Sequence, residues 1–148
     1  FEETMVSTFQ DSHSLFVQIK PGDHIAVRGG SNECWHHGIY VGNQKVIDVW
    51  EVNKDQAKIR EREWGAFAAQ KTDFAWVHYT CVDGVLPLEE TIRLARSVEG
   101  QKFPYSGPFS NCEHFATFLR CKRWKGPSLK LCLFLEKYTS PPRPTGLK

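Results

Sequence analysis

The stretch that decides the fold is His36-His-Gly-Ile-Tyr-Val-Gly-Asn-Gln-Lys-Val-Ile-Asp-Val-Trp-Glu-Val52. Residues 36–41 and 45–52 are rich in β-branched and aromatic side chains, and Gly42-Asn-Gln44 separates the two runs. Strand-forming runs joined by a short turn of this composition are typical of an antiparallel hairpin. We therefore predict two paired strands, over 36–41 and 45–52.

The register of this hairpin decides whether His36 and Asp48 lie on one face. Side chains alternate between faces, so the two residues lie together only if paired positions sum to an even number. A three-residue loop over 42–44 gives that register, whereas a two-residue turn at 43–44 places Asp48 on the opposite face. A carboxylate in an otherwise apolar strand usually has a partner or a function.

Further elements are expected on both sides of the hairpin. Turn residues bound two short apolar runs, over 23–28 and 74–81, that predict strands. Apolar residues recur at helical spacing over 88–98, and Gly100 follows, which predicts a helix. Residues 53–71 are polar and fit a short helix or a covering loop equally well.

A second helix is expected to begin at about Asn111. Ser110 and Glu113 have the spacing of a capping box, and Phe115 with Phe118 or Leu119 would form the buried face. The pattern as a whole predicts an α+β fold, a small antiparallel sheet with helices.

Length and charge bound the organisation of the chain. The 148 residues, 41% of them hydrophobic, suffice for one core. We predict an N-terminal extension over 1–19, one domain over 20–128, and a basic, partly disordered tail over 129–148. Residues 120–148 hold eight Lys or Arg and one acid, net +7, so the first 119 residues carry −5 of the total of +2.

Cysteine usage and hydropathy suggest a location. Five cysteines without a Cys-x-x-Cys pair fit a reducing compartment, so we expect a cytoplasmic protein. The apolar run over 129–135 is interrupted by Lys130 and is far shorter than the ~20 residues of a membrane span. We therefore expect no transmembrane segment in this chain.

Cys112 is the candidate nucleophile. It falls at the start of the predicted second helix, where free N–H groups favour a thiolate, and the preceding loop is expected to leave it accessible. A cysteine nucleophile needs a base and a group that orients the base, and His36 and Asp48 would supply them. His37 is a competing base that points to the opposite face of its strand.

Zinc is a rival for the same residues. The set Cys34, His36, His37, Cys112 and His114 contains suitable ligand types, but its spacing matches no usual structural zinc pattern. We expect neither a metal nor a cofactor.

Four short motifs carry a family resemblance. They are Pro21-Gly-Asp-His24, His36-His-Gly-Ile-Tyr-Val-Gly42, Val46-Ile-Asp48 and Asn111-Cys-Glu-His-Phe115. Over about residues 20–124 the chain resembles the lecithin:retinol acyltransferase family, which includes the HRAS-like suppressor phospholipases and acyltransferases. The resemblance implies the permuted, papain-like NlpC/P60 fold, with Asn-Cys-Glu-His-Phe as its most specific motif.

By this resemblance Cys112 takes an acyl group as a thioester and His36 is the general base. The third polar residue falls on Asp48, where the lipid-acting members usually have His. Those members typically end in a hydrophobic anchor, whereas this chain ends in a basic, proline-containing tail. The resemblance favours an enzyme that deacylates a phospholipid or another acyl ester, with peripheral contact to membranes.

A second interpretation stays open. Several picornaviruses encode a non-proteolytic nonstructural protein of similar size with the same H-box and NC motifs, for which roles in replication or host interaction are proposed. A protein of that kind would act through its surface, with the basic residues over 120–148 contacting RNA or a membrane. The sequence does not distinguish the two, nor does it give the oligomeric state.

Overall fold

A computed structural model describes residues 4–51, 57–79, 84–103 and 112–121. Their elements run in the order β1, α1, β2, β3, β4, β5, α2, β6, α3, α4. The strands are β1 (Thr4–Phe9), β2 (His24–Arg28), β3 (His36–Gly42), β4 (Lys45–Glu51), β5 (Ala57–Glu63) and β6 (Asp73–Tyr79). The helices are α1 (Ser12–Phe16), α2 (Trp64–Phe67), α3 (Leu88–Val98) and α4 (Cys112–Cys121).

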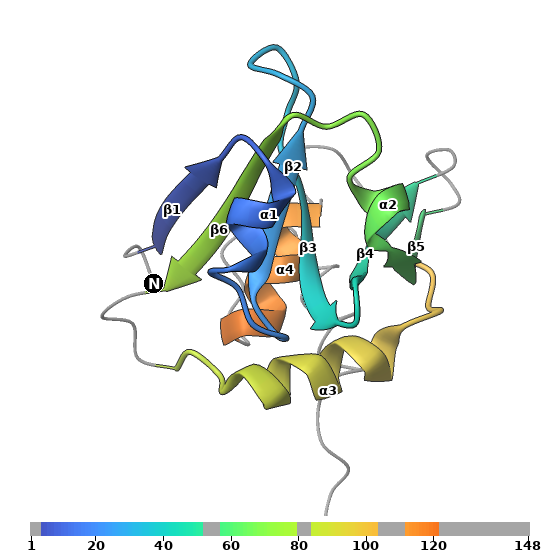
Figure 1. The fold of residues 1–148 in the computed structure, drawn as a ribbon. Helices are drawn as coiled ribbons and strands as arrows, with labels where there is room; N and C mark the ends of the chain where they lie inside the picture. The colour runs from blue at the N-terminus through green and yellow to red at the C-terminus, as the bar shows by residue number, and fades with distance from the viewer. Residues whose placement is uncertain (1–3, 52–56, 80–83, 104–111, 122–148) are drawn as a thin grey trace, which may run out of the picture.

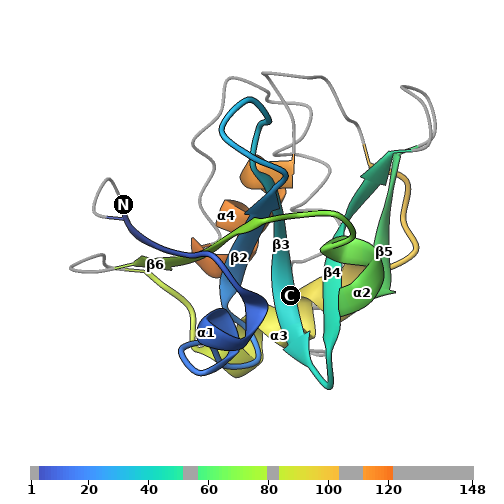
Figure 2. The ribbon, with the colours of Figure 1, turned by 45° about the horizontal axis from the view of Figure 1, so that its top comes forward.

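Six strands of the described ranges form one antiparallel sheet in the order β1-β6-β2-β3-β4-β5. Helices α1 and α2 lie on one side of this sheet, and α4 lies on the other, with α3 across one end of the strands (Figures 1 and 2). The α+β prediction is therefore confirmed, and the permuted papain-like topology stays a prediction.

Each face of the sheet has its own hydrophobic core. Alternate residues of β3, β4 and β5, such as Ile39, Ile47 and Ile59, pack against α3 and α4. The opposite face packs Tyr40 and Val46 against α1, α2 and neighbouring residues. Because side chains alternate along each strand, they contribute to two separate cores. The polar side chains of β3 likewise point to two different faces of the sheet.

The strands predicted over 23–28, 36–41, 45–52 and 74–81 correspond to β2, β3, β4 and β6, and the helix over 88–98 is α3. The interval 53–71 is different from either alternative, because it contains strand β5 before the short helix α2. The prediction for this interval was wrong about the strand. Ser110 and Asn111, the predicted cap of the second helix, lie outside the described residues, and α4 begins at Cys112.

The N-terminal residues are part of the same sheet. Strand β1 pairs with β6 along its whole length, from Thr4 opposite Tyr79 to Phe9 opposite Phe74. Leu15 of α1 is completely buried in the second core. Residues 4–19, expected as an extension, thus contribute a strand and a helix.

Candidate active site

The strand register of the β3–β4 hairpin places His36 and Asp48 on one face, although the turn is not a three-residue loop. The turn has two residues, Asn43 and Gln44, both with positive φ, as in a type I′ hairpin. A β-bulge between Tyr40 and Gly42 then shifts the pairing by one residue. Beyond the bulge Gly38 faces Asp48, a sum of 86, so the even register holds. The expectation that a two-residue turn places Asp48 on the opposite face was wrong, because the bulge restores the register, and His36 and Asp48 do share a face.

Gly38 makes room for the side chains beside it. It lies opposite Asp48 on the face that also carries His36. A Cβ atom at Gly38 would come within 2.7 Å of Val46 Cγ1 and 3.0 Å of Phe67 Cε1. The glycine therefore lets His36 reach Asp48 diagonally across the strand pair.

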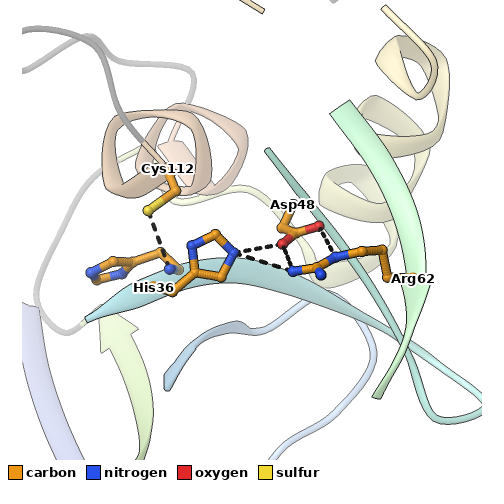
Figure 3. A network of polar contacts seen from close by, with 5 residues as sticks. His36, Asp48, Arg62 and Cys112 are labelled. Carbon is orange, nitrogen blue, oxygen red and sulfur yellow. Dashed lines mark hydrogen bonds and ion pairs between the residues drawn. The ribbon is translucent and has the colours of Figure 1, made fainter. Parts of the chain in front are cut away.

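His36 is held by a completely buried carboxylate. Its Nε2 lies 2.6 Å from Asp48 Oδ2, and the Asp48 side chain has no exposed surface. Because an ionised carboxylate only accepts, Nε2 is the protonated nitrogen and donates to it. Nδ1 is then the nitrogen on the side of the ring that faces Cys112, as Figure 3 shows.

Cys112 lies at the first residue of α4, beside both histidines of β3. The backbone N–H of His37 donates to Cys112 Sγ over 3.4 Å, and the ring of His36 faces the thiol (Figure 3). The start of the helix adds free N–H groups that favour a thiolate. Cys112 is 7% exposed, so it is less accessible than its position after a loop suggests.

The charge of His36 follows from these neighbours. Burial acts to lower its pKa, but the hydrogen bonds and charges of Asp48 and Cys112 outweigh burial and raise the pKa to about 9. His36 is consequently protonated at neutral pH. An imidazolium beside a thiol favours an ion pair with the thiolate, the form that acts as nucleophile.

Arg62 completes the site and was missed by the sequence prediction. Its Nε lies 3.1 Å from Asp48 Oδ1 and its Nη2 lies 2.5 Å from Oδ2, a two-pronged contact. The alternation of Ala57 and Ile59 with charged residues signalled a strand there, but a charged strand residue usually faces solvent. The structure instead leaves the Arg62 side chain only 12% exposed.

His37 belongs to a separate, neutral cluster on the other face. Its Nδ1 lies 2.7 Å from Nε2 of His24, whose Nδ1 lies 2.9 Å from the Tyr79 hydroxyl. Burial, followed by the charge of His36, lowers the pKa of His37 to about 4. Burial likewise lowers the pKa of His24 well below its usual value. The His37 ring thus hydrogen-bonds to His24, and it is the backbone N–H of His37 that contacts Cys112.

A cavity of about 420 Å³ adjoins His36. Its lining is mostly apolar, with Arg62, Lys71 and the protonated His36 as cationic side chains, and comprises His36, Val49, Trp50, Arg62, Ala66, Phe67, Ala69 and Lys71. No group of three His, Cys, Asp or Glu side chains within the described ranges is arranged to hold a metal. None of the helices described there is long and apolar enough to cross a bilayer.

The site has the parts of a thiol acyl-transfer site: a cysteine at a helix start, a histidine facing it, and a carboxylate behind the histidine. The family model of lecithin retinol acyltransferase matches residues 17–124. The chain therefore belongs to this family, which is acyltransferase- and phospholipase-like with Cys and His as catalytic residues. A comparison with curated proteins finds no match.

The family match ends at residue 124, close to residue 121, where the described part of the chain ends. Contact with RNA or a membrane is predicted for the basic residues over 120–148, of which 122–148 lie outside the described residues. The viral interpretation has no support from these comparisons, and the prediction for the tail stays a prediction.

Proposed function

We propose that this protein is a thiol-dependent acyltransferase or phospholipase that forms an acyl thioester on Cys112. The observation that carries the proposal is the position of His36, which contacts Asp48 through Nε2 and faces Cys112 through Nδ1. Membership of an acyltransferase family supports the same chemistry.

The proposed reaction has two steps. In the first step His36 holds the proton of Cys112 at Nδ1, and the thiolate of this ion pair attacks the ester carbonyl to give a tetrahedral intermediate. His36 then donates that proton to the leaving oxygen, so the ester C–O bond breaks and the thioester remains on Cys112. In the second step water or an amine attacks the thioester, and His36 carries the proton from the attacking group to the departing sulfur.

The cavity beside His36 supports a phospholipid as the acyl donor. Trp50 and Phe67 offer apolar surface for part of a hydrocarbon chain. Lys71, whose Nζ lies 3.2 Å from Glu33 Oε1, is a cation at the rim that a phosphate would share with Glu33. We propose peripheral contact with a lipid surface as the source of this substrate. No metal or cofactor enters the mechanism.

The direct test is incubation with a short-chain phosphatidylcholine and measurement of free fatty acid. We expect release by the wild-type protein and a fall of at least about 10³-fold in Cys112→Ala, because no other group replaces the nucleophile. Cys121→Ala is the matched control, since Cys121 is a buried cysteine at the other end of α4. Equal release by Cys112→Ala, or none by the wild type with any acyl ester, contradicts the proposal.

A further inference from the structure

The Asp48–Arg62 ion pair lies behind His36, and Arg62 has no part in the proposed proton transfers. Asp48 has no exposed surface, and both of its oxygens are taken by Arg62, through Nε and Nη2. Two parallel N–H···O bonds fix a carboxylate in its plane as well as in position. The orientation of Asp48 is therefore set from β5 and not from its own strand alone.

Arg62 is itself held on several sides. Its guanidinium carbon lies 4.3 Å from the centre of the Trp50 ring and 5.8 Å from that of Phe67. Stacking on aromatic rings reduces the freedom of the long side chain, so little entropy is lost when it binds Asp48. Trp50 is 38% exposed, so Arg62 contacts a half-exposed ring as well as a completely buried carboxylate.

The same guanidinium also opposes the charge on His36. Arg62 Nη2 lies 3.5 Å from His36 Nε2, and both groups direct N–H bonds at Asp48 Oδ2. Two donors on one oxygen compete, since each cation weakens the attraction of the carboxylate for the other. Arg62 thus draws part of the Asp48 charge away from the imidazolium.

We propose that Arg62 is a positioning residue, which clamps Asp48 so that His36 presents Nδ1 to Cys112 and which moderates the hold of Asp48 on the His36 proton. The role rests on the proposed acyl transfer, in which His36 must give up its proton to the leaving group. Without the clamp, a carboxylate with one partner would hold the imidazolium more tightly and in a less defined orientation.

Arg60 provides an internal comparison. In the register of β4 and β5 it is Arg60 that lies directly opposite Asp48, and Arg62 pairs with Val46. Arg60 is nevertheless exposed, while Arg62 reaches diagonally to the carboxylate. The two arginines share a strand, a face and a charge, so Arg60→Gln controls for loss of a cation from β5.

The first measurement is the pKa of His36, determined by NMR titration of its ring. The proteins compared are the wild type, Arg62→Gln, Asp48→Asn and Arg60→Gln. We expect Arg62→Gln to raise this pKa, because the carboxylate is freed, and Asp48→Asn to lower it. Arg60→Gln should leave it unchanged. Opposite shifts for the two partners of one ion pair are not produced by a general loosening of the fold. An unchanged His36 pKa in Arg62→Gln overturns the proposal.

The second measurement is the rate of Cys112 alkylation by iodoacetamide, followed by mass spectrometry of the Cys112 peptide. We expect Arg62→Gln to be slower by on the order of tenfold, as for other groups that orient a reacting imidazole. The double variant Arg62→Gln/Asp48→Asn should be no slower than Asp48→Asn alone, since Arg62 acts through Asp48. Losses that multiply in the double variant contradict a role through Asp48.

Folding and function are kept apart in this design. Arg62→Lys retains a cation but not the two-pronged contact, so it should alkylate at a rate between those of wild type and Arg62→Gln, and it serves if Arg62→Gln does not fold. Neither measurement uses an acyl substrate. If the His36 pKa shifts as expected but the wild type releases no fatty acid, only the proposed function is contradicted. If fatty acid is released but the His36 pKa is unchanged in Arg62→Gln, only the role of Arg62 is contradicted.

Discussion

His36 and His37 are neighbours on β3, yet they lie in opposite environments. His36 contacts a buried carboxylate and has a pKa raised to about 9, whereas His37 contacts a buried histidine and has a pKa lowered to about 4. The pleat of the strand directs one ring to the Asp48–Arg62 pair and the other to the His24–Tyr79 pair. One residue type thus supplies a reactive cation on one face and a neutral structural link on the other.

The comparison shows why residue identity alone does not assign the base. Both histidines are next to Cys112: the ring of His36 faces the thiol, while His37 contributes its backbone N–H. The difference lies in what stands behind each ring. The carboxylate of Asp48 favours the protonated form of His36, whereas burial, followed by the charge of His36, lowers the pKa of His37 and favours its neutral form.

The largest expected effect comes from removing the reactive ring. His36→Ala should lower the rate of acyl transfer by about 10²–10⁴-fold, because general acid–base catalysis is lost. Its free energy of unfolding near neutral pH should fall by at most about 3 kcal/mol, because the ion pair of His36 with Asp48 is lost while Asp48 keeps Arg62. The rate of fatty-acid release and the urea midpoint measure the two effects. His13→Ala, at an exposed histidine, is the control, and a His36→Ala protein with a wild-type rate would exclude His36 as the base.

The neutral cluster should respond in the reverse way. His24→Ala removes a buried ring, leaves His37 Nδ1 without the partner it has in His24, and removes one hydrogen bond from the Tyr79 hydroxyl. We expect the free energy of unfolding to fall by about 2–5 kcal/mol, from lost packing and unpaired polar groups. Urea denaturation measures it. A change below about 0.5 kcal/mol would show that the cluster contributes nothing to stability.

The surroundings of His36 could be predicted from the sequence better than those of His37. Cys112, His36 and Asp48 carry recognisable motifs, and the hairpin brings the last two together locally, so their cluster was predictable. The bulge at Tyr40–Gly42 was not, because a bulge and an extra loop residue give the same register. Arg62 was missed because its burial depends on an ion pair across two strands, and the strand prediction had left its segment open.

Contacts between strands that are far apart in the sequence could not be predicted. Strand β1 pairs with β6, about seventy positions away, and its residues carry no local signal that names this partner. His24 and Tyr79 belong to β2 and β6, so their contact with His37 likewise depends on the strand order. Such contacts follow from the assembled sheet and not from the spacing of residues along the chain.

A smaller effect should appear in the pH dependence of stability. The stabilisation from His36 is complete below pH 6.5, and it is lost as pH rises through about 9, because its pKa in the fold is raised. His37 acts oppositely: its pKa is lowered, so stability is lost as pH falls from 6.5 toward about 4. Each limb amounts to at most about 3 kcal/mol.

Urea denaturation from pH 4 to pH 9.5 measures both limbs. His36→Gln should flatten the alkaline limb and leave the acidic one, while His37→Gln should reduce the acidic limb. If His36→Gln leaves the alkaline limb as steep as in the wild type, the raised pKa of His36 is not what stabilises the fold.

The central claim is that the Cys112–His36 pair forms an acyl enzyme. The most direct measurement is peptide mass spectrometry after brief exposure to an activated acyl ester at neutral pH, comparing wild type with His36→Ala. The account predicts one acyl group on Cys112 of the wild type, removable by hydroxylamine as a thioester, and little or none on Cys112 of His36→Ala. Equal acylation of Cys112 in both proteins, or acylation of the exposed Cys34 alone, would contradict it.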